Sequence, residues 1–428
     1  MSYFTTETYS MKRDILKFSE KISKGTCKAT KNLCKDVIYG ISASRSSHLS
    51  EIARTLKEDT KLPYTIDRLS SGLADLESDM KEILIQNHQK EIMKLLPDNE
   101  VIVLNDDTDL NKEYSKKLED LCVVRDASSQ TEKYVNGYKV CEYTALSRKN
   151  KTPISLYSKI YSTTSDEFKS ENDETIKGED YVIKLLKENN KTPIFIRDRG
   201  YDANEFFKKD IKEDNKFVTR LKGNRNLRFK DKLRLVKEVA LERKGKVLTT
   251  LMYKGENREC YISYTRVSLP FMKKKQLTLI TIHGLNTDDD LPLMLLTNIK
   301  IEEANTARKI AKLYFLRWRI EEYFKAKKDE FEWENSLLRT IKSMNNFNIF
   351  LTLVMFYMAT IIEKLDTNYF CNIIVERAMA LKEDLIIMFG IISRGVYNIL
   401  KYARTGIYEW KHIKHKEKDK QLSFKLTI

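Results

Sequence analysis

The stretch VIVLNDDTDL, residues 101–110, joins an apolar β-strand to a group of carboxylates. The stretch TPIFIRDRGYD, residues 192–202, repeats this pattern, with an apolar strand before Asp198 and a glycine turn after it. Ligands tend to bind at the strand ends of α/β sheets. Because side chains alternate along a strand, Asp106 and Asp107 are expected on opposite faces. The two stretches therefore predict a sheet in which Asp106 and Asp198 mark a functional edge.

The segments around these stretches continue an α/β pattern. Strands alternating with amphipathic helices are typical of a mixed sheet with helices packed against it. Four short apolar segments that follow predict a β-rich insertion. We expect residues 101–110, 137–162, 192–198 and 216–222 to form one sheet, with helices at 179–189 and 203–214, the insertion at 224–300 and a helix at 310–331 packed on the sheet.

The N-terminal region, residues 1–95, reads as helical. Two short segments have apolar residues at helical spacing, and Pro63 suits the first turn of the second segment. This pair of helices fits either a helix-turn-helix-like DNA reader or a simple pair in a bundle, and the sequence leaves both open. The apolar faces are formed by Leu49, Ile52, Ala53 and Leu56 in the first segment and by Ile66, Leu69 and Leu73 in the second.

Length, charge and cysteine content bound the class of protein. The chain has 428 residues, room for two or three domains, and a net charge of +15, which favours a polyanionic partner and nucleic acid above all. Its six cysteines form no CxxC pair, so we expect reduced thiols and a cytoplasmic protein. The N-terminus lacks the apolar core of a signal peptide. The apolar run at 347–362 is shorter than the roughly 20 residues of a membrane span and predicts a buried helix.

The segment YFLRWRIEEYFKAKKDE, residues 314–330, gathers charged and aromatic side chains on one predicted helix. At about 100° per residue, Tyr314, Arg317, Glu321 and Lys328 fall within an arc of roughly 60°. Glu322 points elsewhere. A network of ion pairs at spacings of three and four residues would produce the same composition. Lys325 joins the polar arc, and Leu313, Ile320, Phe324 and Phe331 form an apolar arc beside it.

Two strand-end aspartates and one helical glutamate suit divalent metal chemistry. Mg²⁺ prefers carboxylate and phosphate oxygens, and two such ions about 4 Å apart can clamp both oxygens of a phosphodiester displacement. Asp106, Asp198 and Glu321 would suffice to hold them. The other nearby acids have structural explanations: Asp107 and Asp109 lie in the strand, Asp202 is predicted to cap a helix, and Asp288–Asp290 to lie in a solvated turn.

The combination resembles a known family. The spacing Tyr-x2-Arg-x3-Glu-x6-Lys at Tyr314, Arg317, Glu321 and Lys328 is similar to the signature of bacterial insertion-sequence transposases of the DDE class, which have an RNase H-like core. The segment DDTDL resembles the region of the family's first aspartate, and IRDRGYD with FVTRLKGNR resembles the region of the second. The resemblance covers roughly residues 95–345 and selects Asp106, although Asp107 stays open as the first ligand.

This resemblance implies a fold and a mechanism. The expected fold is an RNase H-like mixed sheet flanked by helices. Asp106, Asp198 and Glu321 would be catalytic and would bind two Mg²⁺ ions, with Mn²⁺ as a substitute. The protein would nick double-stranded DNA at the inverted repeats of its element and join the freed end to target DNA. It would act as a homodimer in the DNA complex, and no membrane would be involved. Tyr314, Arg317, Lys325 and Lys328 would contact DNA.

Two rival functions remain at this stage. One is a DNA-binding protein that has lost catalysis, and the other is a standalone Mg²⁺-dependent nuclease that cuts without joining.

The chain is predicted to divide into five regions. They are residues 1–95 as a helical region with possible DNA binding, 96–223 as the first part of the core, 224–300 as the insertion, 301–345 as the part with the signature helix that completes the core, and 346–428 as a helical region with a basic tail.

Overall fold

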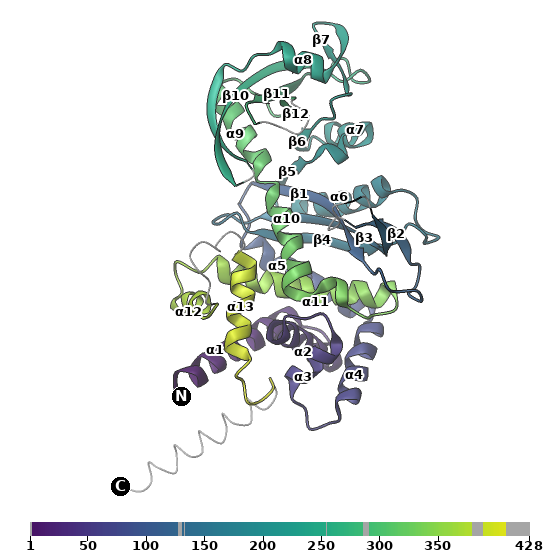
Figure 1. Cartoon of the computed structure of the whole chain (residues 1–428), viewed down its shortest axis with the longest axis vertical. Helices are drawn as coiled ribbons and strands as arrows, with labels where there is room; N and C mark the ends of the chain where they lie inside the picture. The colour runs from purple at the N-terminus through teal and green to yellow at the C-terminus, as the bar shows by residue number, and fades with distance from the viewer. Residues whose placement is uncertain are drawn as a thin grey trace.

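A single mixed β-sheet forms the centre of the molecule. The computed structural model describes residues 2–126, 131, 133–253, 255–285, 291–378 and 388–407. Within these residues, ten strands form the sheet in the order β2-β3-β1-β5-β6-β12-β11-β10-β9, and β4 pairs with β3 (Figure 1). The strands are β1 (Glu100–Asn111), β2 (Cys122–Arg125), β3 (Tyr134–Leu146), β4 (Pro153–Tyr161), β5 (Thr192–Arg197), β6 (Lys216–Arg220), β9 (Val247–Tyr253), β10 (Glu256–Val267), β11 (Leu277–His283) and β12 (Leu293–Thr297).

Strands β1, β5 and β6 are parallel neighbours at the middle of this sheet. Their apolar side chains are buried, including Val103 in β1, Phe195 in β5 and Val218 in β6. Helix α7 (Asn204–Lys212) connects β5 to β6, whereas β2 to β4 and helix α6 (Glu171–Glu188) lie between β1 and β5 in the chain. The prediction that residues 101–110, 137–162, 192–198 and 216–222 contribute to one sheet is confirmed, and helices flank this mixed sheet as expected.

The β-rich stretch extends the central sheet. Strand β12 pairs with β6, so β9 to β12 continue the sheet beyond the core strands. Sequence reasoning did not predict α8 (Val236–Glu242) or the separate two-stranded hairpin of β7 (Asn226–Phe229) and β8 (Lys232–Leu235). Both lie at the end of the molecule that is uppermost in Figure 1.

The signature segment is not the single helix that was predicted. Helix α9 (Ala304–Phe315) ends one residue before Leu316, α10 (Trp318–Lys325) follows, and a π-helical turn, η2 (Ala326–Glu330), closes the segment. Hydrogen bonds of the i to i−3 type join Arg317 to Tyr314 and Ile320 to Arg317, each at 3.0 Å. Tight turns and π turns change the rotation per residue, so a wheel of about 100° per residue fails across this segment.

The helices from both ends of the chain pack together below the sheet (Figure 1). Helix α11 lies between the sheet and the N-terminal helices and contacts β4, α2, α4 and α13. Both predicted amphipathic helices are present as α3 and α4, and both pack on α2; a DNA-reading role for them stays a prediction. The helices are α1 (Ser2–Ile22), α2 (Lys28–Ser44), α3 (Leu49–Leu56), α4 (Leu62–Ala74), α5 (Ser78–Met93), α11 (Ile341–Ile362), α12 (Tyr369–Arg377) and α13 (Met388–Leu400), with short 3₁₀ turns at η1 (Arg199–Tyr201) and η3 (Trp333–Asn335).

Helix α11 is long and apolar enough to span a membrane by length and composition. Its most apolar window has a mean hydropathy of 1.4, and 83% of that window is buried inside the protein. It is therefore packed as the core helix that the sequence predicted. Helices α12 and α13 lie in the predicted C-terminal helical region, residues 346–428, whereas residues 379–387 and the basic tail from 408 to 428 lie outside the described residues.

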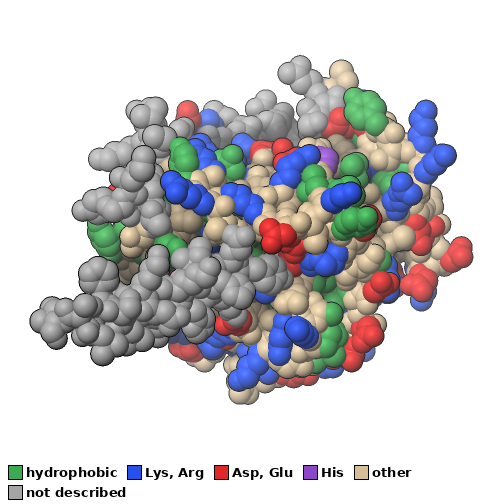
Figure 2. Space-filling model, turned by 90° about the horizontal axis from the view of Figure 1, so that it is seen from below, with side chains coloured by type: hydrophobic (Ala, Val, Ile, Leu, Met, Phe, Trp, Pro, Cys, Tyr) green, Lys and Arg blue, Asp and Glu red, His purple; other side chains and the backbone are tan. Residues whose placement is uncertain are grey.

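The helical end of the molecule has a mixed surface. Seen from below, Lys and Arg side chains are dispersed over its visible part, with acidic and apolar side chains between them (Figure 2). The positive charge of the chain is therefore not gathered into one patch on that visible face.

Candidate active site

Asp106 and Asp198 lie side by side at the same edge of the sheet. Leu104 of β1 is paired in parallel register with Ile196 of β5, and each aspartate follows two residues later. Helices α9 and α10 cross this edge, with α9 against β5 and β6 and α10 against β1. The parallel register therefore brings both acids under the segment that carries Glu321.

Two side chains of the signature segment, Arg317 and Tyr314, contact the three acids. Its guanidinium lies 3.2 Å from an Asp106 carboxylate oxygen and 2.5 Å from a Glu321 carboxylate oxygen. Tyr314 donates a hydrogen bond of 3.2 Å to Asp198, and Arg220 lies 3.8 Å from the same carboxylate. Arg317 thus bridges Asp106 and Glu321, and Asp198 is held beside them by Tyr314 and Arg220.

The electrostatics of this cluster are those of crowded carboxylates. Burial raises the pKa of Asp106 to about 7; the Arg317 cation lowers it, and the neighbouring Asp198 and Glu321 raise it further. Burial also raises the pKa of Tyr314, and the nearby Asp198 adds to that shift. The Asp106 side chain is still 26% exposed, so the site remains open to a ligand.

The other two acids of β1, Asp107 and Asp109, have partners outside the cluster around Arg317. Burial raises the pKa of Asp107 to about 7, the charge of Asp106 adds to this, and a hydrogen bond with Cys141 of the neighbouring strand lowers it. Asp109 lies 3.7 Å from Lys139. Asp107 is thus directed away from Arg317, as the alternation of a strand requires.

Asp202 does not cap α7, contrary to the sequence prediction. The 3₁₀ turn η1 comes first, and Ala203 occupies the N-cap position without a side-chain hydrogen bond. Asp202 instead accepts hydrogen bonds from the Lys222 amide at 2.8 Å and from Arg225 at 2.7 Å, which ties the turn to the loop after β6. The predicted turn at Asp288–Asp290 lies outside the described residues.

The cations of the signature segment have different environments. Lys325 is exposed, whereas Lys328 donates to the Asp109 carbonyl at 2.5 Å and pairs with Glu334 at 3.0 Å. The π turn rotates Lys328 away from the position that a regular helix would give it. The Tyr314 ring is only 5% exposed, so it is not available for stacking on a DNA base in this conformation.

The two glutamates of the segment are separated as predicted. Glu322 pairs with Arg319 at 2.9 Å and takes no part in the cluster around Arg317. Glu321 and Glu322 therefore offer a matched pair of neighbours, one inside the site and one outside it.

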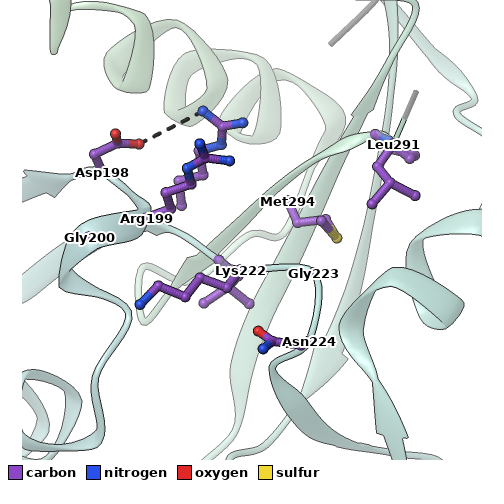
Figure 3. A pocket seen from close by; sticks show the side chains of 11 residues that line it. Asp198, Arg199, Gly200, Lys222, Gly223, Asn224, Leu291 and Met294 are labelled. Atoms are coloured by element: carbon purple, nitrogen blue, oxygen red, sulfur yellow. Dashed lines mark ion pairs between the residues drawn. The ribbon is translucent and has the colours of Figure 1, made fainter. Parts of the chain in front are cut away.

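A cleft of about 560 Å³ opens beside Asp198 and was not predicted from the sequence. Arg199, Arg220 and Lys222 are among the residues that line it, and the dashed line in Figure 3 marks the ion pair between Asp198 and Arg220. A sequence signal for these cations was available, because Arg220 and Lys222 lie two residues apart at the end of the strand that was predicted over residues 216–222.

The carboxylate ligands of the site fit a hard divalent cation, but in this structure the Arg317 side chain lies between two of them. Carboxylate oxygens are the ligands that Mg²⁺ prefers. Within the described residues, no three acidic, histidine or cysteine side chains are close enough together to hold a metal ion. The Arg317 guanidinium bridges Asp106 and Glu321 instead, so metal binding requires this side chain to move.

The DDE class of RNase H-like enzymes is defined by a mixed sheet with two aspartates at the ends of adjacent parallel strands and by a helix that brings a glutamate to them. The sequence profile of the family described as Transposase DDE domain matches residues 100–357, more than half of the chain, and the protein therefore belongs to this family. No curated protein matches the chain. Its function is that of a transposase, and enzymes of this family act on DNA, depend on divalent metal ions and are generally cytosolic.

Proposed function

We propose that this transposase cleaves DNA at the ends of an insertion sequence and transfers the freed strand into target DNA, with Asp106, Asp198 and Glu321 as its catalytic carboxylates. The observation that carries the proposal is that Arg317 bridges Asp106 and Glu321, while Tyr314 of the same segment donates a hydrogen bond to Asp198 at the end of the neighbouring strand. Asp106 rather than Asp107 is the first acid, because only Asp106 faces Arg317.

These three acids would hold Mg²⁺, with two ions in the full site and Mn²⁺ as a substitute. Bound metal supplies Lewis-acid stabilisation of the phosphate and a water of lowered pKa. Tyr314 holds Asp198 in place through its hydrogen bond. Arg317 leaves the carboxylates and binds a phosphate next to the scissile bond, where a guanidinium can make two hydrogen bonds.

The chemistry consists of two phosphoryl transfers. Water attacks the phosphorus at the end of the element, the P–O3′ bond breaks, and a 3′-hydroxyl and a 5′-phosphate are released. The 3′-hydroxyl then attacks a phosphorus of target DNA and displaces another 3′-oxygen. Neither step needs a covalent bond between protein and DNA, since positioning and charge stabilisation carry the reaction.

The proposed DNA contacts and the proposed assembly rest on the charge of the signature segment and on the family resemblance. Lys325 is exposed beside the site and would contact DNA, as would Lys328 after release from Glu334. Inverted repeats, a homodimeric complex with DNA and an association with the nucleoid are part of the proposal. The five regions bounded at residues 95, 223, 300 and 345 remain our proposed organisation of the chain.

The test is Mg²⁺-dependent cleavage of labelled DNA that spans an end of the native element. Asp106→Asn, Asp198→Asn and Glu321→Gln should each abolish cleavage while binding of the end persists. Glu322→Gln is the matched control and should retain cleavage. Loss at Glu322 but not at Glu321 would overturn the assigned register.

The same assay separates the rival functions. Binding without cleavage by the wild-type protein would favour a DNA-binding protein that has lost catalysis. Cleavage without joining of the 3′ end to target DNA would favour a standalone nuclease.

A further inference from the structure

The positive charge of the chain is concentrated in one short segment. Residues 222–246 carry ten Lys and Arg against three Asp and Glu, a net charge of +7 out of +15 for the whole chain. The segment includes the hairpin β7–β8 and helix α8. The visible face of the helical end, in contrast, has basic side chains dispersed among acids (Figure 2).

The hairpin is held firmly against the rest of the protein. Leu227 and Phe229 are buried, and the backbone of Arg228 exchanges hydrogen bonds of 2.8 and 3.1 Å with Ser268, just after β10. Its turn has two residues with positive φ, Lys230 at 49° and Asp231 at 61°, as a tight type I′ turn requires. The basic side chains are therefore presented from a fixed backbone.

Several of these cations lie outside the ion pairs of the described residues. Lys222, Lys230 and Lys232 are exposed and form no ion pair within the described part of the chain, whereas Arg225 and Arg234 are paired with carboxylates. Unpaired like charges on one surface repel each other, and a polyanion relieves that repulsion.

The hairpin is connected to the candidate active site by two adjoining clefts. The cleft beside Asp198 and a second cleft of about 400 Å³ share Lys222 and Asn224 as lining residues. The second cleft continues to Asn226, the first residue of β7. The two clefts lead from Asp198 past Arg199, Arg220 and Lys222 to the start of the hairpin, and Lys230 and Lys232 are exposed at its turn; we call these five cations the basic tract.

We propose that this basic tract is a DNA-binding surface that holds the sugar-phosphate backbone leading away from the scissile bond. The proposal rests on the proposed cleavage site at Asp198. Lysine dominates the outer part of the tract and binds phosphate as a point charge, so the contact is independent of base sequence. The backbone held there belongs either to the DNA flanking the element or to the target DNA, which present the same chemistry.

The test compares Lys230→Gln/Lys232→Gln with Lys184→Gln/Lys187→Gln. The control pair is exposed on α6 and removes the same charge. Binding is measured by fluorescence anisotropy over a range of salt concentrations with two duplexes, one ending at the scissile bond and one extended by flanking DNA. Strand transfer of a pre-cut end into a supercoiled plasmid is measured in parallel.

The hairpin variant should lose about two phosphate contacts, which lowers the slope of log affinity against log salt by about 1.8 and weakens binding by roughly tenfold. A loss confined to the extended duplex assigns the tract to flanking DNA. Unchanged end binding with reduced strand transfer assigns it to target DNA. Equal behaviour of the hairpin and control variants in all assays would overturn the proposal.

These outcomes are distinct from a failure of the proposed function. If the wild-type protein showed no Mg²⁺-dependent cleavage of any duplex, the catalytic assignment would fail. The salt slopes of the two variants would still decide whether the tract binds DNA.

Discussion

Replacing Arg317 with glutamine should increase the affinity of the DNA-free protein for Mn²⁺. The guanidinium is 15% exposed and bridges Asp106 at 3.2 Å and Glu321 at 2.5 Å, so a metal ion must displace it from both carboxylates. A hydrogen bond to a charged group contributes about 1.5–3 kcal/mol. Because both carboxylates are partly exposed, we discount the two bonds to about 2 kcal/mol in total. That difference corresponds to a dissociation constant about 30-fold lower for Arg317→Gln.

Isothermal titration calorimetry with Mn²⁺ in the absence of DNA measures this effect. Arg319→Gln is the control, because it removes the same charge two residues away and, among the described residues, forms its ion pair with Glu322 outside the cluster. Arg317→Gln should also slow cleavage, since the proposed phosphate contact is lost. If the two variants bound Mn²⁺ equally well, competition between Arg317 and the metal would be refuted.

Three further predictions concern single contacts. Glu142→Gln leaves the buried Lys327 without its anionic partner at 3.1 Å and should lower the free energy of unfolding by about 3–5 kcal/mol, measured by denaturant titration. Tyr314→Phe removes the hydrogen bond to Asp198 and should slow cleavage about fivefold, with little change in thermal stability. Burial raises the pKa of Asp106 to about 7 in the metal-free protein. Because the metal binds the deprotonated carboxylate, Mn²⁺ affinity should rise with pH up to about 7 and level off above it.

Each of these predictions has a result that would contradict it. A loss below about 1 kcal/mol for Glu142→Gln would show that the buried pair contributes little. Wild-type cleavage by Tyr314→Phe would remove its positioning role. A pH profile of Mn²⁺ binding that is unchanged in Asp106→Asn would exclude this carboxyl group as the titrating ligand.

The central part of the site was predictable because local patterns there agree with the tertiary structure. Apolar runs of strand length precede both aspartates, and neighbouring parallel strands bring their ends to one edge. Alternation along β1 separates Asp106 from Asp107 without further information. Helical spacing over one turn also places Arg317 and Glu321 together, since they are four residues apart.

The features that escaped prediction depend on tertiary contacts. The π turn at η2 follows no local sequence rule, and it places Lys327 in a fully buried pair with Glu142 of β3 while Lys328 turns to Glu334. The strands β7 and β8 have four residues each and are rich in cations, so their alternating pattern is too short to identify. The cap predicted at Asp202 failed because a 3₁₀ turn precedes α7.

The most direct measurement of the central claim is the location of Mn²⁺ by anomalous diffraction from crystals of the protein bound to DNA from the end of its element. We predict anomalous peaks in direct contact with carboxylate oxygens of Asp106 and Asp198, with Glu321 coordinating one of the ions and Arg317 on a DNA phosphate. Peaks coordinated by Asp107 instead of Asp106, or a site without metal in which Arg317 still bridges Asp106 and Glu321, would contradict the assignment.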